Sequence, residues 1–124
     1  MSRTFLLWGS INALLAVALG AFGAHGLRHI ADAAAIQTWN TAAQYHFYHA
    51  LGLLIIGLLV RFHPKVYIAG YMMLAGIIIF SGSLYALALT QIKLLGAITP
   101  IGGVCFLLGW FWLVKVFWQD HKPG

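Results

Sequence analysis

Long apolar stretches, separated by short polar segments, divide the chain into four parts. Each stretch is close to the roughly 20 residues that an α-helix needs to cross the hydrocarbon core of a bilayer. We place the spans at about residues 5–25, 41–60, 66–89 and 100–118. Each span should be helical, because an isolated strand in lipid would leave backbone groups without hydrogen bonds. The pattern predicts an all-α integral membrane four-helix bundle, formed by a single domain over residues 1–124.

The composition supports a membrane location and excludes a nucleic-acid partner. Hydrophobic residues make up 62% of the 124 residues and charged residues only 7%, where soluble domains carry about 25%. A soluble domain of this size could not bury so much apolar surface. The net charge of +5 comes from Lys and Arg residues that stand singly between apolar runs, so they form no basic patch of the kind that binds nucleic acid.

The ends of the spans carry residues typical of helix termini. Gly26 is suited to the left-handed conformation that often ends a helix, here the first. Thr99 and Pro100 are typical of the cap and first turn of a helix, here the fourth. Residues 28–40 either extend the second helix, with Asp32 as its cap, or form a short helix in the membrane interface. We favour the extension, since the sequence after Asp32 is rich in alanine.

The distribution of positive charge predicts how the chain crosses the membrane. With four spans, both termini and the loop at 61–65 lie on one side, which holds five Lys and Arg residues: Arg3, Arg61, Lys65, Lys115 and Lys122. The other side holds Arg28 and Lys93. Because cytoplasmic segments carry the excess of positive charge, both termini should be cytoplasmic (N-in/C-in). The first span imitates a signal peptide, but its apolar run is longer than a usual signal core, so we expect it to be retained.

Four sequence blocks resemble a known family. They are GAFGAHGL at 20–27, WNTAAQYHFYHALGLL at 39–54, FSGSLYALAL at 80–89 and TPIGGVCFLLGW at 99–110. In this order they resemble the YgdD/YwdK-like family of small bacterial inner-membrane proteins, domain-of-unknown-function family 423. The resemblance covers nearly the whole chain and implies a four-helix, multi-pass protein of the inner membrane. It implies no established biochemical activity, although some members are linked to membrane integrity.

Small residues recur every four positions in the first span and predict a packing ridge. The ridge consists of Asn12, Ala16, Gly20 and Ala24. Such spacing lets two helix backbones approach closely in lipid, and Asn12 could form a hydrogen bond across the contact. We expect the ridge to pack within the chain, with a homodimer face as the alternative.

Polar side chains in the outer halves of the spans predict one cluster. Its members are His25, Tyr45, His49, Ser81 and Tyr85. Tyr45 and His49 are four residues apart, and His46 and His49 are three apart, so all three can share a helix face. Ser81 and Tyr85, four residues apart, can likewise share one. We expect His49 to face the interior and to bond to Tyr85, Ser81 or a main-chain carbonyl, because an unpaired imidazole in lipid is costly.

Three classes of function remain open. A non-catalytic protein could act by packing with lipids, with a second copy or with a partner membrane protein. A haem or metal carrier could use His25, His46 and His49, and a small oligomeric transporter could use histidine as a proton relay. We favour the first and expect no enzyme activity and no cofactor, since no carboxylate lies in a span and the motifs of soluble enzymes are missing.

The start of the fourth helix offers a further candidate site. If that helix began at Thr99, it would expose the backbone amides of three residues: Thr99, Gly102 and Gly103. Free amides at a helix start attract anions such as a lipid phosphate. The family resemblance does not extend to His46, which weakens any site built on that residue.

Overall fold

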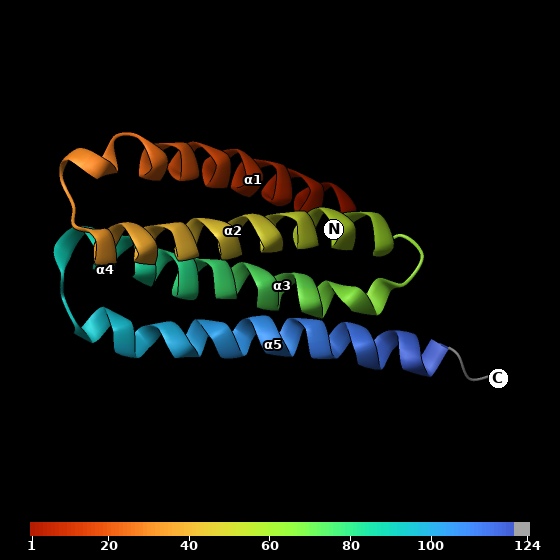
Figure 1. The fold of residues 1–124 in the computed structure, drawn as a ribbon. Coiled ribbons are helices and arrows are strands. Elements are labelled where there is room, and N and C mark those ends of the chain that lie inside the picture. Colours follow the sequence, from red (N-terminus) through yellow and green to blue (C-terminus); the bar gives the residue numbers. More distant parts are fainter. Residues whose placement is uncertain (121–124) are drawn as a thin grey trace.

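Four long helical stretches run antiparallel to one another in the computed structural model, which describes residues 1–120 (Figure 1). All four are long and apolar enough to cross a membrane, which confirms the predicted all-α fold and the number of spans. The third stretch contains a π-helical turn, η3, between two α-helices. The elements are α1 (Ser2–Ala24), η1 (Leu27–His29), α2 (Ala33–Leu59), η2 (Pro64–Val66), α3 (Tyr67–Gly76), η3 (Ile77–Ser81), α4 (Gly82–Thr90) and α5 (Leu94–Asp120).

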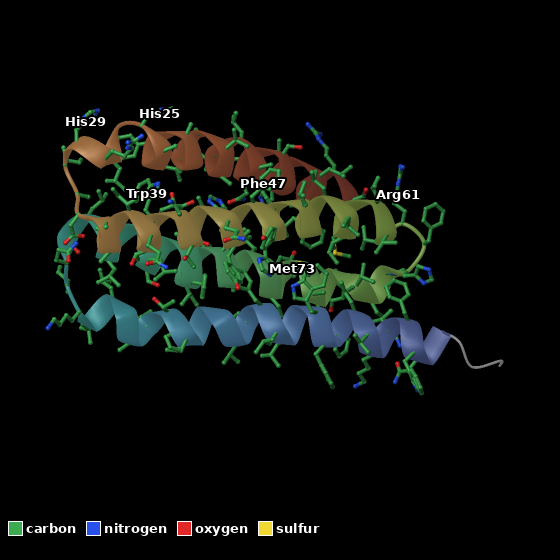
Figure 2. The ribbon with its side chains drawn as sticks, in the orientation of Figure 1. His25, His29, Trp39, Phe47, Arg61 and Met73 are labelled. Atoms are coloured by element: carbon green, nitrogen blue, oxygen red, sulfur yellow. The ribbon has the colours of Figure 1, made fainter. Side chains whose placement is uncertain are left out.

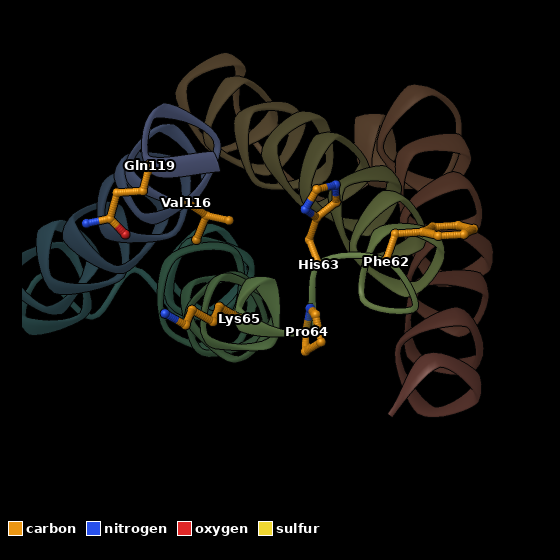
Figure 3. A pocket seen from close by; sticks show the side chains of 6 residues that line it. All are labelled: Phe62, His63, Pro64, Lys65, Val116 and Gln119. Atoms are coloured by element: carbon orange, nitrogen blue, oxygen red, sulfur yellow. The ribbon is translucent and has the colours of Figure 1, made fainter. Parts of the chain in front are cut away.

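The helices are arranged so that α2 lies in the interior (Figure 1). On one side α2 packs along the length of α1, and on the other it contacts α3, η3 and α4. These in turn pack against α5, so that α1 and α5 lie at opposite sides of the molecule (Figure 3). Half of the apolar window of α2 is buried, against 17% for the span that includes α1. Polar residues of α2 can therefore reach partners on helices at both sides.

Two apolar clusters hold the ends of the bundle together. The larger one joins Phe5 of α1 to Leu53 and Ile56 of α2 and to Met73 of α3. The smaller one, at the other end, surrounds Trp39. Along α2 the two histidines of the second span lie between these clusters, which places them inside the bundle.

The second helix begins where the sequence analysis favoured. It starts at Ala33, and the carboxylate of Asp32 accepts a hydrogen bond of 2.8 Å from the Ala35 amide. This confirms Asp32 as the cap and residues 33–40 as part of α2. The prediction for Gly26 is wrong, because α1 ends at Ala24 with His25 as its cap, and Gly26 keeps right-handed backbone angles (φ −70°). The chain turns through the 3₁₀ helix η1 instead.

The fourth helix begins earlier than predicted. It starts at Leu94, so that Pro100 lies inside it. A proline within a helix removes one backbone hydrogen bond, and here the neighbouring Thr99 hydroxyl donates to the Leu95 carbonyl at 3.0 Å. Thr99, Gly102 and Gly103 are therefore interior residues of α5 and offer no free amides. The predicted anion site at a helix start is wrong.

The contact between α1 and α2 uses nearly the same face of α1 as the predicted ridge, except at the C-terminal end of the helix. Ala16 is buried, Asn12 and Gly20 are partly buried, and Ala24 is exposed. The buried small residues are Gly9, Ala16 and Gly23, which are seven residues apart. A spacing of seven keeps positions on one face of a helix that wraps around its partner. The structure therefore places Asn12, Ala16 and Gly20 toward α2, within the chain as predicted, whereas Ala24 lies outside the contact.

Candidate functional site

A chain of hydrogen bonds links three helices in the bundle interior. It consists of Asn12 on α1, His46 on α2 and Tyr85 on α4, and we call it the Asn12–His46–Tyr85 chain. The Nε2 atom of His46 lies 2.9 Å from Oδ1 of Asn12, and Nδ1 lies 3.0 Å from the hydroxyl of Tyr85. His46 is 4% exposed, so these contacts are shielded from the surroundings.

The direction of the hydrogen bond between Asn12 and His46 follows from the outer contact of Asn12. The Nδ2 amide of Asn12 donates to the Trp8 carbonyl at 2.8 Å, which turns Oδ1 toward His46. Because Oδ1 can only accept, Nε2 of His46 donates to it, while Nδ1 meets the Tyr85 hydroxyl, which can donate or accept. Both nitrogens of the imidazole are therefore engaged.

Trp39 covers the Asn12–His46–Tyr85 chain on the side of η1. Its ring lies edge-on to that of Tyr85, with the centroids 4.6 Å apart. Its indole Nε1 donates to the Leu19 carbonyl of α1 at 2.7 Å. A Cβ atom on Gly23 would lie 2.9 Å from that nitrogen, so the glycine makes room for the indole. Trp39 thus links α2 to α1 through a hydrogen bond, and its ring shields the hydroxyl of Tyr85.

A second hydrogen-bonded unit, the His49–Trp110 pair, joins α2 to α5. The indole of Trp110 donates to Nε2 of His49 at 3.0 Å, and Nδ1 of His49 lies 2.7 Å from the Tyr45 carbonyl. Because a carbonyl only accepts, Nδ1 carries the proton and this imidazole is neutral. Its ring stacks on that of Phe106 at a centroid distance of 3.5 Å. The main-chain carbonyl that the sequence analysis allowed as a partner is thus present.

Hydroxyl groups make further links between the spans, among them one of 2.7 Å from Ser2 of α1 to the Gly57 carbonyl of α2. Ser81, in the π-helical turn, is fully buried and donates to the Ala42 carbonyl at 2.9 Å. Ser83 and Thr99 bond to each other at 2.6 Å and so join α4 to α5. The backbones approach closely beside this link, since a Cβ on Gly102 would lie 2.7 Å from the Cα of Phe80. Polar side chains therefore tie every neighbouring pair of spans.

The structure brings together only part of the predicted cluster. Tyr85 is inside the bundle, but its partner is His46 and not His49. Ser81 contacts neither imidazole ring. Tyr45 lies beside His49 as predicted, with the two rings stacked at a centroid distance of 6.4 Å, although it is 39% exposed and also packs against Phe80. His25 does not join the cluster. It caps α1 and is exposed at the end of the bundle opposite the two chain termini, near His29 (Figure 2).

Comparison with known proteins identifies the family. The model of a family described as "Protein of unknown function (DUF423)" matches residues 19–103. The chain belongs to the DUF423 family. It is 52% identical to the UPF0382 membrane protein YwdK of Bacillus subtilis over 115 residues, which is 90% of this chain and 94% of that protein. It is 50% identical to a UPF0382 membrane protein of Staphylococcus saprophyticus, again over 90% of this chain and 94% of the relative. No solved structure matches it.

The matched region of this DUF423 protein contains most of the interior hydrogen bonds, but not all of them. His46, His49 and Tyr85 lie inside it, whereas Asn12 and Trp110 lie outside. With its named relatives and its four apolar spans, the chain is a multi-pass membrane protein of unknown function.

Sequence reasoning missed the role of two residues of the site, His46 and Trp110, whereas the expected hydrogen bond of Asn12 across the α1–α2 contact is present. His46 was placed on one face with Tyr45 and His49 and considered as a metal ligand, but its bond to Tyr85 was not predicted. It shares the buried face of α2 with Ala42, Ala43 and Ala50. That spacing of small residues was the signal that could have placed it in the interior. No such spacing of small residues points to Trp110 as an interior residue, because α5 is apolar around its whole circumference.

The three histidines proposed as metal or haem ligands are not placed as a ligand set. His25 lines a hollow at the surface with Arg28 and His29, while His46 and His49 are buried in the bundle. All four ring nitrogens of the buried pair already have hydrogen-bond partners. A metal ion could bind there only after one of these contacts between helices had been broken.

Proposed function

We propose that this DUF423 protein is a non-catalytic component of the bacterial inner membrane that supports membrane integrity through its packing with lipids or partner proteins. One observation carries the proposal. In the part of the chain that the structure describes, no buried side-chain nitrogen or oxygen lacks a hydrogen-bond partner. The polar groups of the interior therefore serve to hold helices together, which supports a packing role over a ligand or proton role.

The positions of two hollows on the protein surface support a role in contacts with lipids or partner proteins. One of about 360 Å³ lies where the α2–α3 loop faces the end of α5, between His63, Lys65 and Gln119 (Figure 3). Another is apolar and lies on the outer face of α3 and α5, around Met72 and Phe111. Both open outward, toward the membrane interface and the lipid. Such surfaces suit contacts with lipids and other proteins.

Complementation of a bacterium that lacks its DUF423 gene would test the proposal. Membrane permeability to a dye should rise in the deletion strain and return to normal with the wild-type gene. We expect His25→Ala and His49→Phe to restore the barrier in proportion to the folded protein in the membrane, because neither imidazole is assigned a chemical role. If His49→Phe accumulated normally in folded form but restored nothing, a ligand or proton role would replace the packing role.

We further propose that both termini face the cytoplasm. The two ends of the described chain lie at the same end of the bundle, together with the 61–65 loop (Figure 1). Four of the five positive residues predicted for that side, Arg3, Arg61, Lys65 and Lys115, are within the described residues, whereas Lys122 lies outside them. The opposite end carries Arg28 and Lys93. The positive-inside rule then favours the N-in/C-in arrangement.

Reporter fusions would test this orientation. A fluorescent protein that matures only in the cytoplasm should be bright when fused after residue 124. Alkaline phosphatase, which needs the periplasm, should be active when inserted in the loop at 91–93 and inactive at the C-terminus. The reverse pattern would show that the charge difference of five to two does not set the orientation of this protein.

A further inference from the structure

A groove between α1 and the end of α2 combines positive charge with apolar side chains. Its volume is about 410 Å³, and the residues that line it are Ser2, Arg3, Leu6, Leu7, Ser10 and Arg61. The five residues from α1 recur at intervals of three or four and so form one face of that helix. Figure 2 shows Arg61 at the end of α2, on the side where α1 begins. The two guanidinium groups therefore belong to one groove although 58 positions separate them in the sequence.

The two helices that form this groove, α1 and α2, contain no acidic residue to balance its positive charge. The whole chain contains only two acidic residues, Asp32 and Asp120. Asp32 caps the opposite end of α2, and Asp120 ends α5, which lies on the far side of the bundle from α1 (Figure 3). Both arginines are exposed. An external anion is the partner that would balance them.

The length of the groove along α1 suits a lipid better than a free ion. From Arg3 to Ser10 the α1 backbone rises by about 10 Å, which is enough to pass from the headgroup level to the start of the hydrocarbon core. Leu7, 53% exposed, and Leu6 line the inner part. The backbones of α1 and α2 touch behind them, because a Cβ on Gly57 would lie 3.0 Å from the Leu6 amide. The two packed backbones thus form a rigid floor for the groove. The groove carries positive charge at one end and apolar side chains along the rest.

We propose that this groove binds an anionic phospholipid, with the headgroup phosphate between Arg3 and Arg61 and an acyl chain along Leu6 and Leu7. Guanidinium groups bind phosphate oxygens through paired hydrogen bonds. Two arginines without an acidic neighbour favour a lipid of net negative charge over a zwitterionic one. The proposal deepens the proposed action on lipids and rests on it, but it concerns one site and is tested on the purified protein.

Native mass spectrometry of the protein in mild detergent would measure the binding of phosphatidylglycerol and of phosphatidylcholine. At about fivefold per arginine near a membrane surface, the double variant R3Q/R61Q should bind phosphatidylglycerol about 25-fold more weakly. Its binding of phosphatidylcholine should stay nearly unchanged. The matched control R28Q/K93Q removes the same charge from the opposite end and should retain wild-type affinity. An equal loss in both double variants would overturn the proposal, because it would show attraction by net charge alone.

Inorganic phosphate distinguishes the lipid from a free anion. Phosphate at millimolar concentration should not displace phosphatidylglycerol, because it gains nothing from the apolar part of the groove. Displacement would show a simple anion site and contradict the lipid assignment.

Labelling of the unaltered protein provides a test that needs no variant to fold. An arginine-specific dicarbonyl reagent should modify Arg3 and Arg61 several-fold more slowly in phosphatidylglycerol micelles than in phosphatidylcholine micelles, with Arg28 as the internal reference. Equal protection of all three arginines would overturn the site. Either failure would leave the complementation result standing, so the lipid site and the wider role in membrane integrity can fail separately.

Discussion

Replacement of Gly9 by alanine should destabilise the protein by about 1–3 kcal/mol, the usual range for overpacking a well-packed interior. A Cβ at this position would lie 2.8 Å from Cγ of Leu54, 2.9 Å from the Leu54 amide and 3.0 Å from the Ala50 carbonyl. Two of these three atoms belong to the α2 backbone, so a rotamer change cannot relieve the clash and the helices must separate. Thermal unfolding in detergent, followed by circular dichroism, would measure the loss.

The same substitution at Gly20 is the matched control. It lies on the same helix, but its nearest neighbour would be the Cβ of Ala43 at 3.8 Å, which is an ordinary van der Waals contact. Alanine is favoured over glycine in a helix by up to about 1 kcal/mol, so Gly20→Ala should be neutral or stabilising. Similar effects at both positions would show that the α1–α2 contact has been assigned to the wrong face of α1.

This contrast shows what the sequence could predict and what it could not. The lengths of the apolar stretches predicted four spans, since the thickness of the bilayer fixes how many residues a helix needs. The rotation of each helix about its own axis is not set in this way. Gly9, Gly20 and Gly23 stand in equally apolar surroundings in the sequence, and lipid and protein interior are both apolar, so hydrophobicity does not tell the buried face from the exposed one.

The interior hydrogen bonds illustrate the same limit. The sequence predicted a buried histidine in the second span with a partner, and His49 meets that expectation through the Tyr45 carbonyl. It did not predict that Tyr85 pairs with His46, or that Trp110 approaches from 61 residues away. Positions three apart on a helix differ by about 60° around its axis. His46 therefore meets α1 and α4 while His49 meets α5, and the sequence does not reveal how these spans are placed around α2.

The sequence predicted a helix end correctly where a nearby side chain caps the helix. It failed where contacts with another helix determine how far the helix extends. Asp32 caps α2 by accepting a hydrogen bond from the amide three residues ahead. Both residues are close in the sequence, so this contact can be predicted from the sequence alone. Pro100 was taken as the first turn of a helix, yet α5 continues through it. The bond between Thr99 and Ser83 of α4 ties this turn to a neighbouring helix, and its effect depends on the tertiary structure.

Replacement of His46 by phenylalanine should cost about 1–3 kcal/mol of stability. It leaves Oδ1 of Asn12 and the hydroxyl of Tyr85 without their shared partner, and each hydrogen bond between membrane helices contributes about 0.6 kcal/mol on average and up to about 1.7. An unpaired polar group in the interior adds a desolvation cost. The variant should still insert, because phenylalanine preserves the apolar character of the span.

A double-mutant cycle with Tyr85→Phe would isolate the bond between His46 and Tyr85. The two losses should combine to less than their sum, with a coupling of about 0.5–1.5 kcal/mol, because each substitution removes the same bond. Tyr48→Phe is the control, since Tyr48 is 49% exposed and its hydroxyl bonds only to the Nε2 amide of Gln44 one turn away. Its effect should stay below about 0.5 kcal/mol, as for most surface substitutions. Additive losses at His46 and Tyr85, or a loss at His46 no larger than at Tyr48, would show that the Asn12–His46–Tyr85 chain does not hold the three helices together. The polar interior would then require an explanation other than packing.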